Sequence, residues 1–545
     1  MNRTMSFAVL IIFVSFAFAS AGHASDTDAA APATVDATVT PAPAEVPVAP
    51  APAEVTAPPA SSGAAANTPQ EKALRHKEIG DGYRMRGEVP GAAQEYAKAL
   101  ALYDGFSTED RYMMSQYLSW DKKLDEAIRV LEKILSEEPG NLKARIHLAR
   151  CLSWNGDQNA ALAEASKALA ASPGNKDALL VRANALRWSG NQNASVSIYK
   201  EILEKEEDFD TRMALSQAYL ADEYLRGARN GAELLDPEYP YQEKEVAELR
   251  KEIKDATRSE VGAGYSFYSD SDSNRVNRYN AYGAFWTGYL RWRIGYLYTD
   301  ASDPVIDSSN QEITLSVDSR PLEWLWVGGT IGYSIPEGDP DSVVIGGVRA
   351  GTKFFGGRID ARVNRGVLTD TSTLIDNRIW YTEGAVVINY PLPYRFSLMA
   401  SFAGRDYSDD NRSIDAQGML RYVFGWQNPA VGVGYRFQYL DFDRESGGGY
   451  FDPSGYMSHR LDVSFNYTIW RMYAYLDLFG GYQYYDRYAQ SYSGFFEGWE
   501  AVLGMRVTDS INFELHSDGS SEAGGVSSGS GFHYYLVGAR VRARF

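Results

Sequence analysis

The segment 534–545, which reads YYLVGARVRARF, decides the fold of the C-terminal half of the chain. Apolar residues and arginines alternate in it, which is the period-two pattern of a β-strand with two different faces. The apolar set is Tyr535, Val537, Ala539, Val541, Ala543 and Phe545, and the basic set is Arg540, Arg542 and Arg544. If Phe545 faces lipid, the arginines face the inside of a barrel, because arginine facing lipid costs about 2–4 kcal/mol at the bilayer midplane.

The same alternation recurs from residue 258 onward and predicts a transmembrane β-barrel. Clear examples are 261–267, 313–317, 359–363, 431–439 and 461–467. Each stretch is long enough to cross a bilayer as a tilted strand, which takes about 10 residues, whereas the strands of a soluble β-sandwich are shorter. Tight turns alternate with longer polar loops, so we predict an antiparallel barrel of about 16 strands over 258–545.

By the same parity, we expect further charged side chains to point into the barrel. The basic ones are Arg291, Arg293, Arg358, Arg362 and Arg436, and the acidic ones are Glu312, Asp360, Asp415 and Asp462. Two interpretations fit: a network of ion pairs that stiffens the wall, or a polar track for a hydrated polymer, which can be anionic. In the second, the basic set and the three arginines of 534–545 form the track.

A repeat of about 34 residues precedes the barrel. Trp120, Trp154 and Trp188 keep this spacing, and so does a register of small residues, Ala93, Ala127, Ala161 and Ser195. The period, with helical spacing inside each unit, is typical of tetratricopeptide repeats. We therefore predict an all-α solenoid with a connector helix over 71–257, which offers a concave surface to a protein partner. The tryptophans either pack helices together or stack on sugar rings.

The remaining N-terminal sequence predicts export. Arg3 and the apolar run 5–18, followed by small residues, are typical of a cleaved signal peptide, which we assign to 1–24. The region 25–70 is rich in Ala and Pro and predicts a disordered linker. The only cysteine, Cys151, lies in an apolar helical pattern and cannot form an intrachain disulfide or a Cys-rich zinc site.

Composition excludes two classes of protein. The formal net charge of -18 leaves too few basic residues for a nucleic-acid binder. A mean hydropathy of -0.35 and the lack of apolar runs of about 20 residues after the N-terminus exclude a polytopic helical membrane protein. Metal-ligand spacings and nucleotide-binding fingerprints are not evident, so we expect no cofactor and no metal.

A loop element gives the chain a family resemblance. The segment 450–456, YFDPSGY, contains Tyr450, Asp452, Pro453 and Tyr456. With the tryptophan-bearing solenoid and the C-terminal barrel, it resembles the YaiO-type outer-membrane proteins and the export porins for poly-N-acetylglucosamine and cellulose. Those families carry a similar Tyr-Phe/Tyr-Ser-Pro-x-x-Tyr element, in which Ser stands where this chain has Asp452, and the porins carry more repeats. The loop is either a rigid plug or a sugar-contacting gate.

The resemblance implies a role in exopolysaccharide secretion at the outer membrane of a Gram-negative bacterium. The barrel would sit in outer-membrane lipid and pass a polysaccharide. The solenoid would lie in the periplasm and dock exopolysaccharide machinery or a modifying enzyme, and the final strand would be recognised by the barrel assembly machinery. The alternative is a non-conducting scaffold or assembly protein whose barrel anchors the solenoid.

A lipid-modifying enzyme is a third hypothesis, and the sequence gives it little support. Such barrels need a serine and a histidine with an orienting polar group. The histidines of the barrel region are His459, His516 and His533. Ser458 and His459 are adjacent in a strand, so their side chains face opposite sides. We therefore predict that the protein is not an enzyme.

Overall fold

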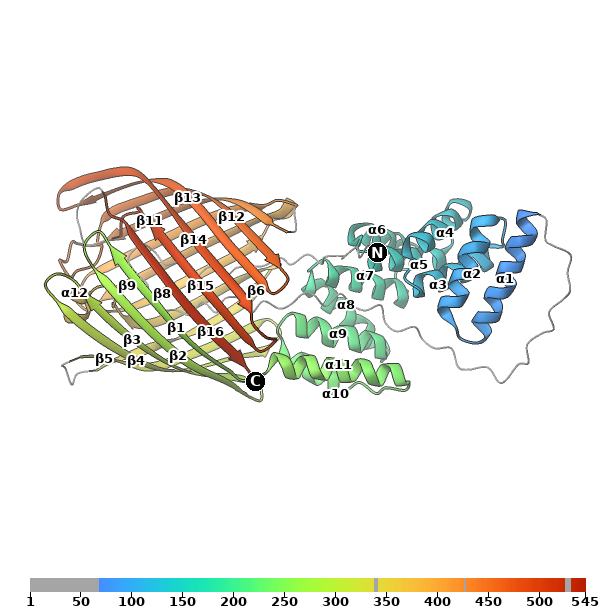
Figure 1. Ribbon diagram of the computed structural model, residues 1–545, viewed down its shortest axis with the longest axis horizontal. Coiled ribbons are helices and arrows are strands. Elements are labelled where there is room, and N and C mark those ends of the chain that lie inside the picture. The colour runs from blue at the N-terminus through green and yellow to red at the C-terminus, as the bar shows by residue number, and fades with distance from the viewer. Residues whose placement is uncertain (1–67, 338–341, 426–427, 525–530) are drawn as a thin grey trace. The chain divides into compact units, whose positions relative to one another are not determined.

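The computed structural model describes residues 68–337, 342–425, 428–524 and 531–545, which form two compact units (Figure 1). The helical unit and the barrel unit meet in the chain at Ile253 and Lys254. The predicted signal peptide, 1–24, and nearly all of the predicted linker lie outside the described residues. The last two linker positions, Pro69 and Gln70, belong to the first helix, because Thr68 caps it through a hydrogen bond from the Glu71 backbone N–H.

The helical unit consists of antiparallel helix pairs, as the 34-residue period predicts, and then one longer helix. The helices are α1 (Pro69–Met85), α2 (Val89–Leu102), α3 (Thr108–Trp120), α4 (Leu124–Glu137), α5 (Leu142–Trp154), α6 (Gln158–Ala171), α7 (Lys176–Trp188), α8 (Gln192–Lys205), α9 (Phe209–Ala221), α10 (Leu225–Glu233) and α11 (Pro240–Ala256). The solenoid is confirmed. Among the described residues, no helix is long and apolar enough to cross a membrane.

Small residues set the distance between the paired helices. Ala93, Ala127, Ala161 and Ser195 stand in α2, α4, α6 and α8, and each is fully buried. A larger side chain at these positions would force the helices apart, because protein interiors are close-packed. Asn141 and Asn175 begin α5 and α7, where each side chain accepts a hydrogen bond from the backbone N–H of the third residue beyond it.

The last repeat of the solenoid is a complete helix pair, α9 and α10. The connection before α9 covers 206–208, whereas the equivalent connections cover 138–141 and 172–175. This shortening moves the last pair out of the exact 34-residue register. Tyr219 and Ala228 are nevertheless buried in the same core as the preceding helices.

The barrel unit is a closed antiparallel sheet of sixteen strands, as predicted. The strands are β1 (Glu260–Asp270), β2 (Arg275–Thr287), β3 (Leu290–Ser302), β4 (Asp307–Leu322), β5 (Leu325–Pro336), β6 (Val343–Phe354), β7 (Gly357–Val367), β8 (Trp380–Pro391), β9 (Phe396–Tyr407), β10 (Arg412–Val423), β11 (Ala430–Phe442), β12 (Ser454–Ile469), β13 (Met472–Arg487), β14 (Gln490–Arg506), β15 (Ile511–Ser520) and β16 (Tyr534–Arg544). Each strand pairs with its neighbours in sequence, and β1 closes the ring against β16.

The two ends of the barrel differ in their connections. Residues 260 and 544 lie at one end of the barrel, which we call the turn end. Short turns at this end join β2 to β3, β4 to β5 and so on to β14 and β15. The opposite end, the loop end, carries longer connections, among them 368–379 with the short helix α12 (Ser372–Asp376). One connection at the loop end contradicts the predicted alternation, because only Tyr488 and Ala489 join β13 to β14. Both have positive φ, which fits a two-residue hairpin turn.

Candidate functional site

The barrel wall has an apolar outer face and a polar inner face. Large apolar side chains lie exposed on the outside, such as Val348 at 66% and Leu461 at 65%. The next residue along β12, Asp462, points inward and is buried. A closed sheet leaves no unpaired backbone edge, and an apolar exterior around it is what a bilayer-spanning barrel requires.

All of the arginines predicted to point inward stand on the inner face by strand parity, and several form ion pairs there. Arg358 contacts Asp360 at 2.6 Å, and Arg362 contacts Glu383 at 2.9 Å. Glu383 is buried and also binds Arg405 of β9 at 2.7 Å. Pairing of this kind fits the stiffening network of the first interpretation.

A second group of inward arginines surrounds the junction of β16 and β1 at the turn end. We call Arg291, Arg293, Arg540, Arg542 and Arg544 the seam cluster. Arg544 contacts Glu260 at 2.9 Å, Arg291 lies 4.0 Å from the same carboxylate, and Arg540 pairs with Glu514. The guanidinium of Arg293 lies 3.9 Å from the ring centroid of Tyr282.

Acidic and basic groups also meet at mid-height on the β10 to β15 side of the wall. Arg460 contacts Asp477 at 2.8 Å and lies 3.4 Å above the Phe479 ring. Arg436 and Arg460 face each other across β11 and β12 and line a cavity of about 60 Å³ together with Tyr534. The predicted acids Asp415 and Asp462 are buried in this wall, and Glu312 and Asp360 stand on the inner faces of β4 and β7.

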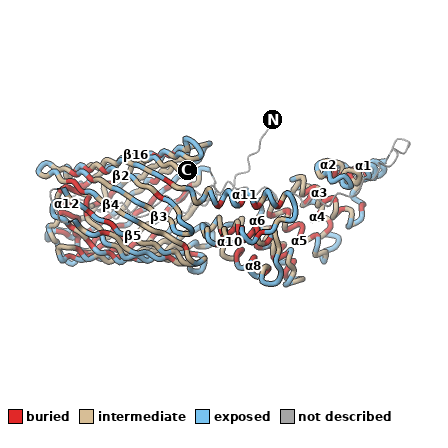
Figure 2. The backbone as a smooth tube through the Cα atoms, turned by 90° about the horizontal axis from the view of Figure 1, so that it is seen from below, coloured by how far each residue is buried: buried red, intermediate tan, exposed pale blue. Residues whose placement is uncertain are grey.

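The loop end holds an aromatic core inside the barrel, which we call the mouth plug. Its residues come from strands β8, β9 and β11 to β13, from the connections between β7 and β8 and between β11 and β12, and from the connection that follows β15; they are Leu368, Leu374, Ile379, Tyr381, Tyr407, Leu440, Phe442, Tyr450, Phe451, Tyr456, Tyr485 and Ala523. Tyr450 stacks on Tyr407 with ring centroids 5.0 Å apart. Figure 2 shows buried segments around α12, at the end of the barrel away from residue 545.

The predicted loop element provides the centre of the mouth plug. Tyr450 donates a hydrogen bond to Asp409 at 2.9 Å, and Tyr456 donates one to Glu522 at 2.6 Å. Asp452 and Arg487 form an ion pair at 2.8 Å in which both side chains are almost fully buried. The carboxylate of Asp452 also accepts a hydrogen bond from the backbone N–H of Ser446, and Pro453 is buried beside it. These contacts place the element inside a packed core.

The connection 368–379 crosses the mouth of the barrel, and we call it the crossbar. Near its start, Asp370 accepts a hydrogen bond from Arg278 of β2 at 2.9 Å. Ser372 donates one to Asp303, in the connection between β3 and β4, at 2.6 Å. Asn377 donates one to the carbonyl of Gly448, in the connection between β11 and β12, at 3.1 Å. Because these partners stand on nearly opposite sides of a sixteen-strand ring, the crossbar spans the opening.

Sequence reasoning predicted longer polar loops between the strands but missed the crossbar. Its partners are distant in sequence, since Arg278 and Asp370 are 92 residues apart. The close approach of the two loops depends on Gly449, which has a φ of 96° and where a Cβ would come within 2.9 Å of Thr373. The short run Leu374-Ile375 in a polar loop was the available signal, because both side chains are buried.

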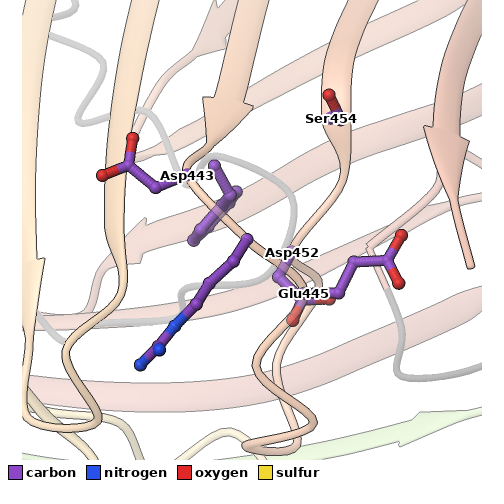
Figure 3. A pocket seen from close by; sticks show the side chains of 6 residues that line it. Asp443, Glu445, Asp452 and Ser454 are labelled. Atoms are coloured by element: carbon purple, nitrogen blue, oxygen red, sulfur yellow. The ribbon is translucent and has the colours of Figure 1, made fainter.

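A second pocket, of about 290 Å³, opens at the loop end beside the mouth plug (Figure 3). Its lining includes Asp443, Glu445, Asp452 and Ser454. The side chains of Asp443 and Glu445 point to opposite sides of the strand end (Figure 3). In the described part of the chain, no group of three His, Cys, Asp or Glu side chains is placed to hold a metal ion.

The repeat tryptophans occupy equivalent places in the helical unit. Trp120, Trp154 and Trp188 are the last residues of α3, α5 and α7, and each is half-buried. Trp120 packs edge to face on Tyr117 with centroids 4.9 Å apart, and the Arg187 guanidinium lies 5.7 Å from the Trp188 ring. Each ring thus contributes one side to packing and leaves part of its surface accessible.

Two pairs among the described residues, Ser458 with His459 and Cys151 with His147, are not arranged for nucleophilic chemistry. Ser458 is buried on the inner face, whereas His459 is exposed on the outer face and bonds Tyr435 through Nδ1 at 2.8 Å. In the helical unit, His147 Nε2 lies 3.8 Å from Cys151 Sγ. Burial lowers the pKa of His147 to about 4 and raises the pKa of Cys151 to about 12, so the pair stays neutral and the thiol is a poor nucleophile.

Comparison with known proteins covers both units. The family model of the tetratricopeptide repeat matches residues 121–164. A bacterial polysaccharide outer membrane secretin is similar over 53% of this chain and 99% of its own, with 11% identity and a TM-score of 0.45. A tetratricopeptide repeat protein from Parabacteroides merdae is similar over 33% of this chain and 71% of its own, with 17% identity and a TM-score of 0.30.

A third solved structure, CdiB from Acinetobacter baumannii, is similar over 53% of this chain and 60% of its own, with 10% identity and a TM-score of 0.35. No curated protein matches the sequence. The tetratricopeptide match and the sixteen-strand barrel fit the repeat-plus-barrel architecture of the export porins that the sequence resembles.

Proposed function

We propose that the protein is a porin-like component of exopolysaccharide secretion in the outer membrane of a Gram-negative bacterium. The observation that carries the proposal is a closed barrel with a charged inner wall whose opening is crossed by a loop. A wall that only anchored another domain would not need so many solvent-accessible arginines. A hydrated polymer, by contrast, needs a polar path, because its hydroxyl groups cannot be left without hydrogen bonds.

In this proposal the turn end faces the periplasm and the loop end faces the outside, which is the usual arrangement of bacterial barrels with short turns and longer loops. The polymer enters at the turn end, beside the seam cluster, and leaves past the crossbar and the mouth plug. The crossbar is therefore the gate, since its bonds to Asp303 and Gly448 must open to clear the path.

The helical unit docks periplasmic partners in this scheme, either exopolysaccharide machinery or a modifying enzyme. Stacked helix pairs present an extended surface and have no chemistry of their own. The accessible sides of Trp120, Trp154 and Trp188 are our candidate contacts, for a partner protein or for sugar rings. The last strand, β16, is the segment that we expect the barrel assembly machinery to recognise.

The second candidate function is a non-conducting scaffold, and the mouth plug is the observation that favours it. The buried pair of Asp452 and Arg487 and the stacked rings of Tyr407 and Tyr450 fill part of the interior with fixed groups. A plug that never moves would leave the barrel as an anchor for the helical unit.

Single-channel recording in planar bilayers separates the two functions. The wild-type protein is compared with a variant in which residues 371–377 are replaced by a Gly-Ser segment of equal length. We expect brief or small openings from the wild type and a stable, larger conductance from the variant, because the bonds across the mouth are gone. The same replacement of the turn 392–395, at the opposite end, is the control and should behave as wild type. A crossbar variant that never conducts rejects the porin.

A further inference from the structure

The seam cluster carries more positive charge than its surroundings neutralise. Four of its guanidinium groups, those of Arg291, Arg540, Arg542 and Arg544, share two carboxylates, Glu260 of β1 and Glu514 of β15, whereas Asp318, opposite Arg291 on β4, binds Arg349. Glu260 is shared, because it accepts hydrogen bonds from Arg544 at 2.9 Å and from Tyr282 at 2.6 Å and has Arg291 at 4.0 Å. The inner wall therefore holds a fixed positive excess at the turn end, although the whole chain is strongly acidic.

Arg542 is the clearest part of this excess. It stands on β16 between Arg540 and Arg544, each of which has a carboxylate partner. Across the described residues, the Arg542 side chain has no hydrogen bond and no ion pair of its own, and its coupling to Glu260 and Glu514 acts over a longer range. An arginine without a partner on a polar inner wall is ready to bind an external anion.

The geometry suits a repeating ligand rather than a single ion. Alternate residues of a strand lie about 7 Å apart, so Arg540, Arg542 and Arg544 form a row along the barrel wall. Across the seam, β1 contributes Gly262 and Gly264 opposite Arg542 and Arg540, and the side chains of Tyr282 and Asn280 on β2 lie over these glycines. Guanidinium groups bind carboxylate, sulfate and phosphate with two parallel hydrogen bonds.

We propose that the seam cluster binds the acidic groups of an anionic polysaccharide, such as a polymer of uronic acids, at the turn-end entrance of the barrel. The inference deepens the proposed function and rests on it, since it names the chemical class of the polymer that the barrel passes. Bilayer lipids cannot supply the ligand, because the row lies on the inner side of a closed wall. The charge excess attracts a polyanion, whereas it gives a neutral polymer no electrostatic advantage.

Calorimetric titration of the purified full-length protein in neutral detergent tests the proposal without any requirement for conductance. The probes are oligomers of galacturonic acid and neutral malto-oligosaccharides of the same length. We expect the acidic oligomer to bind at least about tenfold more tightly at 0.05 M salt. The preference should shrink at 0.5 M salt, because ions screen accessible charges.

Arg542→Gln and Arg542→Glu locate the site. Because the Arg542 side chain has no hydrogen bond or ion pair, Arg542→Gln leaves no carboxylate without its partner, and we expect the fold to be unchanged. We expect Arg542→Gln to weaken binding of the acidic oligomer about threefold to fivefold, the range of an accessible ion pair, and Arg542→Glu to weaken it further. The matched control is Arg412→Gln, at the loop end, where the Arg412 side chain is exposed and pairs with Asp406. This control should bind as wild type.

Two results would overturn the inference. One is equal affinity for the acidic and neutral oligomers at low salt, and the other is acidic binding that Arg542→Glu leaves unchanged. The proposed function is judged separately, by the conductance of the crossbar variant. If the barrel conducts but shows no preference for acidic oligomers, only the proposal of a polyanionic ligand is rejected. If it binds acidic oligomers but never conducts, only the proposal of a porin is rejected.

Discussion

The helical unit and the barrel unit fill their interiors in opposite ways. Between its helices the helical unit buries alanine, as at Ala127 and Ala161, and Arg111 is the only lysine, arginine or carboxylate buried among its described residues. The barrel buries carboxylates and guanidinium groups, as at Asp452 and Arg487, and exposes its apolar side chains on the outside. The difference follows from what surrounds each unit, because a solenoid must hide apolar surface from water, whereas a barrel wall must offer it to lipid.

The comparison shows where the interior of each unit can accommodate a charged or a larger side chain. In the mouth plug, the buried charges of Asp452 and Arg487 are in contact with each other, since an unpaired buried ion costs several kcal/mol. Inside the helical unit, neither charge nor volume can be added. Three substitutions or changes of condition challenge this contrast, beginning with the largest expected effect.

Removing one member of the buried ion pair tests the barrel interior. Arg487→Met leaves the carboxylate of Asp452 buried without its partner, and we expect a loss of about 3–5 kcal/mol in the stability of the mouth plug. Unfolding in guanidinium chloride, with the protein in detergent micelles, measures it, and faster proteolysis at Arg444 reports the loosened loop. The double variant Arg487→Met with Asp452→Leu should recover most of the loss. If the double variant is no more stable than the single one, packing and not charge is responsible.

Acid tests the interior of the helical unit through His147, which is buried with 4% of its surface exposed. Burial, reinforced by the charge of Arg150, lowers the pKa of His147 from its usual 6.5 to about 4. The unfolded chain therefore binds more protons than the folded one between these values. Stability is complete above about pH 6.5 and falls as the pH drops toward 4, by about 3 kcal/mol.

The helical circular dichroism signal, followed during urea unfolding at pH 7 and at pH 4.5, measures this dependence. Because acidic side chains of the helical unit titrate in part of the same range, His147→Gln is the matched comparison. The variant should lose the share of the pH dependence that belongs to the imidazole. An unchanged slope between pH 6.5 and 4.5 in His147→Gln would show that the carboxylates account for all of it.

A larger side chain should change the stability of the two units differently, and this is the smallest of the three effects that we expect. Ala161→Leu inserts a larger side chain at a fully buried helix crossing and should destabilise the helical unit by about 1–3 kcal/mol. The same substitution at Ala263, exposed on the outer face of β1, should leave the unfolding midpoint of the barrel unchanged. Urea titrations of the two variants, monitored by circular dichroism, provide the comparison. A loss in Ala263→Leu as large as that in Ala161→Leu would contradict it.

Regular patterns made the two architectures predictable. The 34-residue spacing of Ala127 and Ala161 gives the solenoid, because helix pairs pack only where the crossing is small. The alternation in 534–545 gives the inner and outer faces of β16, because lipid excludes arginine. Where the regularity breaks, the pattern says less, because the short connection 206–208 takes α9 and α10 out of the exact 34-residue register. The hairpin at Tyr488 and Ala489 was also misjudged, since neither residue is a usual choice for positive φ.

The candidate site was predictable only where it follows strand parity. Parity alone put Arg540 and Arg542 on the inner face. The crossbar and the mouth plug depend on contacts between connections that are far apart in sequence, such as the bond from Asn377 to Gly448. No local pattern encodes such a contact, because it arises only after the ring of strands has brought the two loops together.

The pairing of β1 with β16 also constrains the order in which the strands of the barrel can assemble. Ser259 and Phe545 exchange two backbone hydrogen bonds, and Arg544 reaches Glu260 across 284 positions of the chain. None of these bonds can form until the end of the chain, residue 545, has reached the membrane. Every other strand pairing joins neighbours in sequence, so closure of the ring is the one pairing that requires both ends of the sheet, and until it forms the sheet has two free edges.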